Sequence, residues 1–307
     1  MAAPPPPPPP PGDTLRGFLF ALAAYLMWGI LPLYMKALAD VPPAEVVAHR
    51  ILWSVPVALA ILAATGRTAD LRAAMRTPSM LGMAAVTAGL VAVNWGIYVH
   101  AIGSGQALEA ALGYYINPLF SILLGVLLLG ERLRPLQVAA VALAGLAVGL
   151  LTWEAGRLPV VALGLTVTWG FYAYFKRRLP IGPNQGFTLE VLILLPLAAG
   201  YIVWLWAQDA GHFAQSPRTA ALLAGTGLVT AIPLMTYANG AKGLRLSTIG
   251  IMQYIAPTLI LLTAVFLFNE PFGPARAVAF PMIWGALALY SLSLVRGGRR
   301  QAQAPGS

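Results

Sequence analysis

The sequence predicts an all-α integral membrane protein with ten transmembrane helices, arranged as two inverted five-helix repeats. Of its 307 residues, 59% are hydrophobic and 9% are charged, and the apolar runs are too long and too numerous for a soluble core. The stretch 88–135 also recurs 139 residues later, so that Tyr115 matches Tyr254 and Pro118 matches Pro257. Because each half holds five apolar runs, an odd number, the second copy must enter the membrane from the opposite side.

Ten runs of about 20 mostly apolar residues define the predicted helices. They lie near 17–36, 45–64, 80–101, 107–130, 135–153, 159–175, 187–206, 219–240, 247–269 and 275–295. The first run follows Arg16 as a signal peptide would, but it is too long and lacks a small-x-small cleavage site. We therefore expect it to be retained as the first helix.

This division of the chain predicts two repeats between two tails. We expect a disordered Pro-rich cytoplasmic tail over 1–15, a first repeat over 16–154, a second repeat over 159–296 and a basic cytoplasmic tail over 297–307. The eight consecutive prolines of the first tail cannot form a helix and favour an extended polyproline II conformation. We interpret that tail as having no essential role, with a ligand for proline-recognition domains as the alternative.

The basic residues are unevenly divided between the two sides of the predicted bundle. With the N-terminus inside, 14 of the 19 lie on the cytoplasmic side, and the other side holds only Lys36, Arg50, Arg157, Arg218 and Arg276. The positive-inside rule then places both termini in the cytoplasm. The net charge of +9 is thus a topology signal, and we expect no nucleic-acid partner.

The sequence lacks the motifs of pumps, metalloenzymes and membrane proteases. It has no G-x-x-x-x-G-K-[ST] loop to bind ATP, no H-E-x-x-H pair and no cysteine, so we expect no cofactor and no metal. All four aspartates lie in tails or loops. The string Ile102-Gly103-Ser104-Gly105 narrowly misses the G-x-S-G of rhomboid-type proteases and is interpreted as a turn. No catalytic residue can be named.

Few polar side chains remain inside the predicted membrane region, where a central charge costs about 2.5–3.5 kcal/mol. On the fourth helix Glu109, Gly113 and Asn117 are spaced by four, which keeps them on one face. Such a face is suited either to close helix packing or to lining a cavity. Glu109 is also the best candidate for proton or ion coupling, although a permanent ion pair is an equal alternative.

Arg50 is the most informative of these residues, because it lies about five residues inside the second helix. Three interpretations remain open: it extends to the interface, it binds an anionic group of a substrate, or it pairs with Glu109 until substrate competes. Both residues belong to the non-cytoplasmic side and their predicted depths are similar.

Two further groups of polar and aromatic residues recur in the repeat. Asn94 and Tyr98 give the third helix a short polar face, and Tyr98 matches Tyr237. Around the paired prolines lie Tyr115 and Asn117 in one copy and Gln253 and Tyr254 in the other, and helices broken near a repeat axis are where transporters place their sites. The predicted substrate-binding residues are Arg50, Asn94, Tyr98, Glu109, Tyr115, Asn117, Tyr237, Gln253 and Tyr254.

Two more repeated features have simpler interpretations. Trp28-Gly29 and Trp169-Gly170 form a matching pair on the first and sixth helices. Glu131 and Glu270 each follow a helix at a turn, and we expect them to cap or pair locally.

The chain resembles the EamA family of the drug/metabolite transporter superfamily, specifically its RarD-type members. The strings that carry the resemblance include 29–36 (GILPLYMK), 48–54 (AHRILWS), 108–119 (LEAALGYYINPL) and 253–258 (QYIAPT). The similarity covers about 16–295, and the string from Leu108 is the most specific. It implies ten helices with both ends inside, and movement of small metabolites or drugs by alternating access. The family label also links it to chloramphenicol sensitivity.

The function that follows is an ATP-independent permease of the inner membrane, acting on a small-molecule substrate within the lipid bilayer. One alternative is a receptor or scaffold that transports nothing, and a weaker one is a lipid-modifying enzyme. Counterflow in reconstituted vesicles separates the first two, and lipid turnover without flux would favour the third. The sequence does not predict the substrate, the direction of transport or the oligomeric state.

Overall fold

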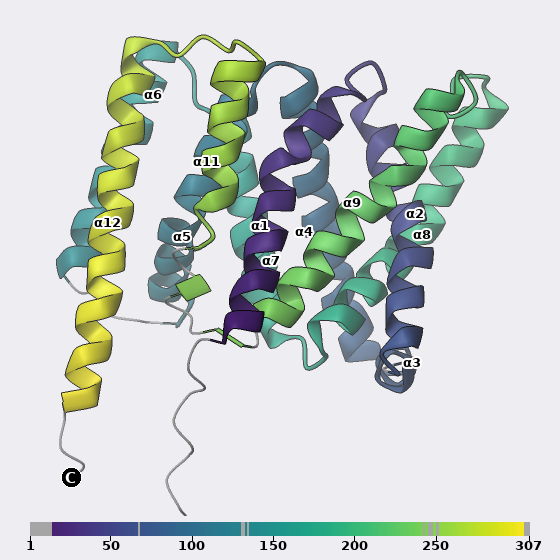
Figure 1. Ribbon diagram of the computed structural model, residues 1–307, viewed down its shortest axis with the longest axis horizontal. Coiled ribbons are helices and arrows are strands. Elements are labelled where there is room, and N and C mark those ends of the chain that lie inside the picture. Colours follow the sequence, from purple (N-terminus) through teal and green to yellow (C-terminus); the bar gives the residue numbers. More distant parts are fainter. Residues whose placement is uncertain are drawn as a thin grey trace, which may run out of the picture.

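The protein is a bundle of helices in a computed structural model (Figure 1). The structure describes residues 14–66, 68–129, 133, 135–241, 243–244, 248–249 and 252–303. Its elements are α1 (Leu15–Lys36), α2 (Pro43–Ala64), α3 (Thr68–Met75), α4 (Pro78–Gly103), α5 (Ala107–Leu129), α6 (Pro135–Ala155), α7 (Val160–Arg178), α8 (Pro183–Ala207), α9 (Pro217–Ala241), α11 (Ile255–Leu262), the π-helix η1 (Thr263–Leu267) and α12 (Pro274–Gln303).

The all-α membrane class predicted from the sequence is confirmed. Within the described ranges, eight helices are long and apolar enough to cross a membrane, namely α1, α2, α4, α5, α6, α8, α9 and α12. The predicted sixth and ninth runs are helical but fall short of this measure. Helix α7 ends in the basic residues Lys176 to Arg178, and the apolar segment formed by α11 and η1 spans only Ile255–Leu267. The short helix α3, in the connection after α2, was not predicted.

Prolines and acidic caps set where several helices begin. Proline occupies the first turn of α2, α4 and α8, where its missing N–H has no intrahelical partner to lose. Glu270, in the loop after η1, caps α5: its carboxylate accepts the N–H groups of Ala107 at 2.7 Å and Leu108 at 2.9 Å. The capping role predicted for Glu270 is confirmed. Glu131 and residues 1–13 lie outside the described residues, so the predictions for them stay predictions.

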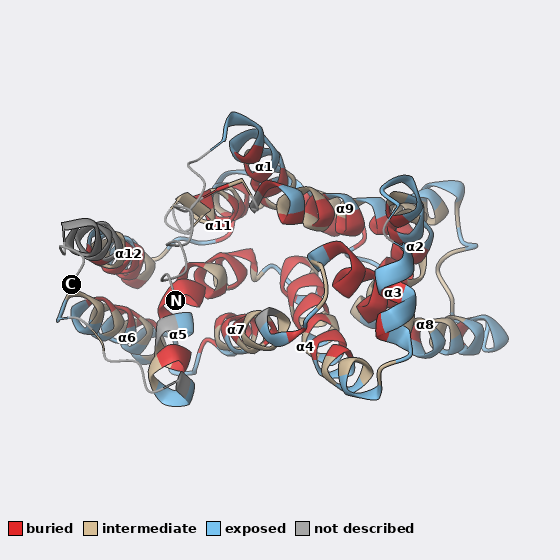
Figure 2. Ribbon diagram, turned by 90° about the horizontal axis from the view of Figure 1, so that it is seen from below, coloured by how far each residue is buried: buried red, intermediate tan, exposed pale blue. Residues whose placement is uncertain are grey.

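The start of the first described helix and the end of the last one lie at the same end of the bundle. Helix α1 begins and α12 ends at the bottom of Figure 1, which we call the N/C end, and the opposite end is the far end. The N/C end also carries α3, which lies across one edge of the bundle when viewed from that side in Figure 2. Because the connections between helices are short, α2 starts at the far end and α8 starts at the N/C end.

The helices pack mainly across the two halves of the chain. The closest pairs include α1 with α9, α2 with α8 and α9, α4 with α7 and α8, and α5 with α7 and α11. Helices α6 and α12 pack against each other at one edge (Figure 2). Buried faces point into the bundle, and many large apolar side chains on the opposite faces are exposed, as expected for helices surrounded by lipid.

Candidate functional site

The guanidinium of Arg50 is buried in the bundle. Proline starts α2 at Pro43, and Arg50 follows about 10 Å along the helix axis. The side chain is 3% exposed. Its Nε donates a hydrogen bond to Thr230 Oγ1 of α9 at 3.0 Å, and its Cζ lies 4.7 Å from the ring centroid of Trp95 on α4. Its Nη1 is buried without a hydrogen-bond partner among the residues that the structure describes.

Polar and aromatic side chains of α4 and α5 surround this guanidinium. Asn94 Nδ2 donates to Thr168 Oγ1 of α7 at 2.8 Å, and Tyr114 donates its hydroxyl to Asn94 Oδ1 at 3.4 Å. The rings of Tyr98 and Tyr114 are 6.0 Å apart, and both tyrosines lie close enough to Arg50 to interact with it electrostatically. These contacts form one group, the Arg50 cluster, which consists of Arg50, Asn94, Trp95, Tyr98, Tyr114 and Thr230.

A column of aromatic rings leads from this cluster toward the N/C end. The ring of Tyr114 lies 6.4 Å from Trp169, whose ring lies 5.3 Å from Tyr172, both on α7. The Tyr172 hydroxyl donates to Glu190 Oε2 of α8 at 3.3 Å, and Lys176 Nζ forms an ion pair with Glu190 Oε1 at 2.6 Å. The column therefore connects two buried charged sites, one near each end of the bundle.

Arg50 and Glu190 occupy matching positions on α2 and α8. Pro43 and Pro183 start these helices 140 residues apart, and the prolines inside both helices keep the same offset. That offset maps Arg50 onto Glu190. Sequence reasoning missed Glu190 because it used an offset of 139 from other helices and did not compare α2 with α8, although the two pairs of prolines carried the signal.

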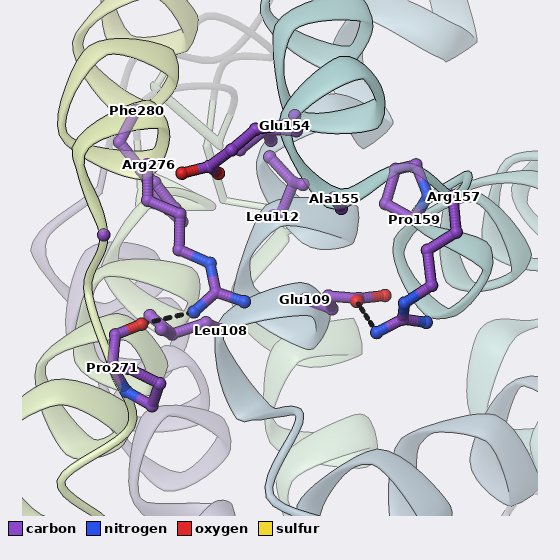
Figure 3. A pocket seen from close by; sticks show the side chains of 12 residues that line it. Leu108, Glu109, Leu112, Glu154, Ala155, Arg157, Pro159, Pro271, Arg276 and Phe280 are labelled. Carbon is purple, nitrogen blue, oxygen red and sulfur yellow. Dashed lines mark hydrogen bonds and ion pairs between the residues drawn. The ribbon is translucent and has the colours of Figure 1, made fainter.

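The ion pair between Arg50 and Glu109, one of the three interpretations of Arg50, is not formed in the structure. Glu109, in the first turn of α5, pairs instead with Arg157 before α7 at 3.4 Å, and the Arg157 side chain is 64% exposed. The two residues lie beside a cavity of about 240 Å³ that Glu154 and Arg276 also line (Figure 3). Both residues lie near the starts of their helices, but Arg50 points toward α4 and α9 while Glu109 points toward the loop before α7.

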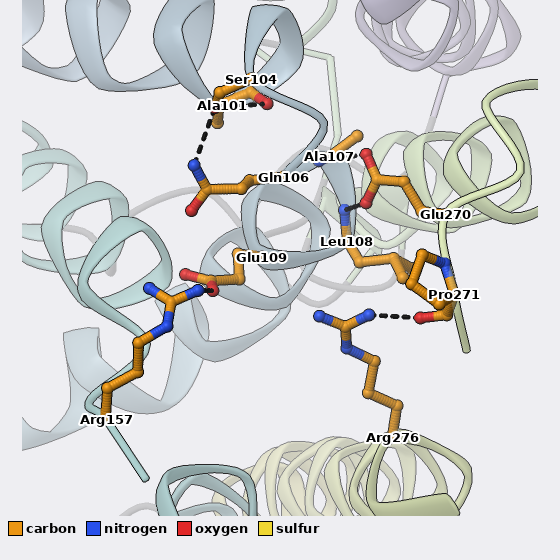
Figure 4. A network of polar contacts seen from close by, with 10 residues as sticks. All are labelled: Ala101, Ser104, Gln106, Ala107, Leu108, Glu109, Arg157, Glu270, Pro271 and Arg276. Carbon is orange, nitrogen blue, oxygen red and sulfur yellow. Dashed lines mark hydrogen bonds and ion pairs between the residues drawn. The ribbon is translucent and has the colours of Figure 1, made fainter. Parts of the chain in front are cut away.

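This far-end cavity is bordered by the capped start of α5. Figure 4 shows Glu270 holding the N–H groups of Ala107 and Leu108, with Arg276 donating to the carbonyl of Pro271 nearby. The Glu270 carboxylate, Arg157 and Arg276 are thus engaged locally. Arg157 and Glu154 are exposed, whereas the Glu109 side chain is 12% exposed and its Oε2 is buried without a partner among the described residues.

The proline-flanking tyrosines form a third location. The Tyr115 hydroxyl and Thr258 Oγ1 of α11 are 2.7 Å apart, and the rings of Tyr115 and Tyr254 are stacked at 6.5 Å. They line a cavity of about 380 Å³ together with residues of α12. Asn117 is buried with its Oδ1 unpartnered among the described residues, and Gln253 is half-buried. The structure brings Tyr115 and Tyr254 together, but this group is separate from the Arg50 cluster.

Tyr237 lies in a fourth place. Its ring is 5.6 Å from Tyr25 and 5.5 Å from Trp28, both on α1, in an aromatic group between α1 and α9. The nine predicted residues therefore do not form one site. Only Arg50, Asn94 and Tyr98 fall within the Arg50 cluster. The structure adds three residues that were not among the nine predicted ones: Trp95, Tyr114 and Thr230.

A loop closes the bundle near Arg50 at the far end. His212, between α8 and α9, places its Nδ1 2.7 Å from Glu45 Oε2, and its backbone N–H donates to Glu45 Oε1 at 2.6 Å. The adjacent Phe213 stacks on His49 at 5.1 Å and on Trp53 at 6.1 Å. These contacts fasten the loop to the first turns of α2, the helix that carries Arg50.

Comparison with known proteins identifies the group to which these helices belong. The model of the EamA-like transporter family matches residues 15–153. An uncharacterized transporter of Vibrio cholerae is 40% identical over 95% of this chain and 97% of its own length, and the protein RarD of Escherichia coli is 38% identical over 95% and 99%. The chain belongs to the EamA family.

Other EamA-family relatives and a solved structure agree with this assignment. The chloramphenicol-sensitive protein RarD of Pseudomonas aeruginosa is 34% identical over 94% of this chain and 97% of its own length. A crystal structure with 24% identity covers 91% of this chain and 98% of its own, with a TM-score of 0.62, which supports the fold. This EamA protein is therefore a multi-pass membrane transporter, and the expectation that it is not an enzyme is confirmed.

Proposed function

We propose that the protein is an ATP-independent permease of the inner membrane that moves a small metabolite or drug-like molecule by alternating access around the Arg50 cluster. The observation that carries this proposal is a buried guanidinium, with one nitrogen unpartnered, at a place where helices of both halves meet. A charge at such depth is costly, and in membrane proteins it marks a pathway for substrate or ions. Relatives named as transporters support the same role.

The packing of the helices supports an inverted repeat. Matching the five membrane helices of each half pairs α1 with α7, α2 with α8, α4 with α9, α5 with α11 and α6 with α12. Under this exchange, the contact of α1 with α9 becomes that of α7 with α4, and α2 with α9 becomes α8 with α4. The contact of α1 with α11 becomes that of α7 with α5, and each helix of the pairs α2/α8, α5/α11 and α6/α12 packs on its own counterpart. Because α2 starts at the far end and α8 at the N/C end, a two-fold axis in the membrane plane would account for this pattern.

Two glycines support the same relation at the level of side chains. A Cβ on Gly29 of α1 would collide with Leu259 of α11, and a Cβ on Gly170 of α7 would collide with Phe120 of α5. Leu259 and Phe120 are 139 residues apart, which is the offset of the repeat. Close packing at matched glycines gives the two halves equivalent contacts, as alternating access by exchange of two repeats requires.

The orientation of the proposed permease follows from its charges. The start of α1 and the end of α12 lie at the N/C end, which also carries the basic residues of α3 and of the end of α7. The positive-inside rule places this end in the cytoplasm and Arg50 nearer the outside. A reporter that works only in the cytoplasm should be active when fused after Ser307, and activity only of an exported reporter would contradict this orientation.

Transport can be tested without knowing the substrate. Vesicles containing the purified protein are loaded with the small-molecule fraction of a bacterial extract and diluted, and the compounds that remain are followed by mass spectrometry. One or a few compounds should leave faster than from protein-free vesicles, and the Arg50→Gln protein should slow their loss. Equal retention in all vesicles would contradict the permease, and a ligand that stabilises the protein without such flux would favour a receptor.

A further inference from the structure

The positive charge of Arg50 has no counterion in the part of the chain that the structure describes. The ion pairs there join Arg157 to Glu109, Lys176 to Glu190 and His212 to Glu45. Arg50 has a neutral hydroxyl on Nε and the face of Trp95 against its plane. These contacts leave the charge itself unneutralised, and its Nη1 has no acceptor.

A second donor close to Arg50 also lacks a hydrogen-bond partner among the described residues. The hydroxyl of Tyr98 is buried and makes no hydrogen bond with any described residue, although its ring lies beside Tyr114. A guanidinium and a phenol that both lack an acceptor are complementary to an oxyanion, which brings negative charge and several lone pairs. Burial of these groups without such a partner costs free energy that ligand binding would recover.

We propose that the Arg50 cluster binds the carboxylate of a small organic anion, with Arg50 Nη1 and the Tyr98 hydroxyl as donors. This inference rests on the proposed function and specifies its substrate class. The planar guanidinium offers the paired N–H donors that match a carboxylate. One negative charge balances the one uncompensated positive charge, so the bound cluster is neutral.

The walls of the site define the rest of the ligand. Trp95 stacks on one side of the guanidinium, and the rings of Tyr114 and Trp169 continue the aromatic surface toward α7. Aromatic faces pack well against flat apolar groups. The ligand is therefore a carboxylate with an aromatic or similarly flat apolar body.

The second buried charge disfavours cationic ligands. Glu190, at the other end of the aromatic column, is already neutralised by Lys176 at 2.6 Å and bonded by Tyr172. A cation would have to displace Lys176 to use that carboxylate, and it would meet an uncompensated positive charge at Arg50. The electrostatics of the column favour an anion at the Arg50 end.

The test uses the full-length protein in detergent at constant ionic strength. Its unfolding temperature is measured with benzoate, phenylacetate or 3-phenylpropionate, with the matching uncharged amides, and with chloride or phosphate as inorganic anions. At least one aromatic carboxylate should raise the unfolding temperature of the wild type by about 3 °C at saturation, and its amide should not. Arg50→Gln should weaken the affinity for the carboxylate by about 30-fold or more, because it removes the charged donor. A correspondingly higher carboxylate concentration would then be needed for the same rise in unfolding temperature.

Control variants separate the site from general charge effects. Arg218→Gln removes one positive charge from an exposed position in the first turn of α9 and should respond to carboxylates as the wild type does. Arg50→Lys should restore part of the binding, since it keeps the charge but not the planar pair of donors. Equal stabilisation by amides, an unchanged response of Arg50→Gln, or no response to any of the three carboxylates would each overturn the proposal.

The vesicle assay distinguishes failure of this inference from failure of the proposed function. If only neutral or cationic compounds leave the vesicles, the permease stands and the anion site is wrong. If carboxylates stabilise the protein through Arg50 but no compound leaves, the site stands and the transport proposal is wrong. Stabilisation by chloride or phosphate as strong as that by the carboxylates would exclude the aromatic body as a determinant of binding.

Discussion

The two buried charges at matching positions of α2 and α8 differ in whether a counterion neutralises them. Glu190 is fully buried but neutralised by Lys176 on the adjacent α7 and bonded by Tyr172. Arg50 is equally deep but has only a hydroxyl, a ring face and an unpartnered nitrogen. The sequence thus keeps a charge at this place in both halves, while its sign and its pairing differ. The paired site can hold the N/C end together, and the unpaired site remains available to a ligand.

The first prediction breaks the balanced site. Lys176→Met should destabilise the protein by about 3–5 kcal/mol, because it leaves Glu190 buried without a counterion. Adding Glu190→Met should recover most of this loss, since the pair is then replaced by apolar side chains. Equilibrium unfolding in mixed detergent micelles measures both effects. Lys36→Met, which replaces an exposed lysine at the end of α1, serves as a control. If the Lys176→Met protein is as stable as this control, the ion pair with Glu190 does not contribute the predicted stability.

The second prediction tests whether the two halves of the chain pack in the same way, although their buried charges differ. Gly29→Ala and Gly170→Ala should each destabilise by about 1–3 kcal/mol, because the new methyl group collides with Leu259 or Phe120. Gly89→Ala meets nothing within 4 Å and should instead stabilise its helix by about 0.5–1 kcal/mol. Unfolding measurements on the three variants decide. A penalty at one glycine only would argue against matched contacts in the two halves.

The third prediction concerns the unbalanced site and has the opposite sign. Arg50→Met should raise the stability of the ligand-free protein by about 1 kcal/mol, since it removes an uncompensated buried charge and loses only the Thr230 hydrogen bond and the Trp95 contact. The same substitution should abolish stabilisation by aromatic carboxylates. Loss of several kcal/mol instead would mean that Arg50 is balanced by a partner and belongs with the structural charges.

The features of this fold that can be predicted from the sequence are those that a linear pattern encodes. Apolar runs predicted the helices, and prolines at matched places indicated the proposed repeat, because hydrophobicity and backbone constraints are local. The end of the bundle was also predictable, so Arg50 and Glu109 were correctly placed toward the same end. The direction in which each side chain points around its helix depends on which helices pack together, and that is why Arg50 meets Thr230 and Trp95 while Glu109 meets Arg157.

The departures in the fold have similar causes. Helix α3 has no long apolar run, and its eight residues are helical in a connection where composition suggested only a loop. The pairing of Glu190 with Lys176 joins two residues 14 apart on different helices, across the turn between α7 and α8. The buried position of Glu190, though not α3, was within reach of a closer comparison of the two halves. The identity of the hydroxyl and ring partners of Arg50 was not, since threonine and tryptophan are ordinary in membrane helices.

The smallest predicted effect concerns the exposed pair at the far-end cavity. Arg157→Gln should change stability by no more than about 0.5 kcal/mol, because the Arg157 side chain is 64% exposed and water and salt screen its interaction with Glu109 at 3.4 Å. Unfolding is measured at low and at high salt. The variant and the wild type should differ slightly at low salt and have the same stability, within error, at high salt. This near-neutral result, compared with the large loss of stability in Lys176→Met, would show that burial determines how much an ion pair contributes to the free energy of unfolding in this bundle. A loss comparable to that of Lys176→Met would place Glu109 and Arg157 among the structural charges and would remove Glu109 as a candidate for coupling.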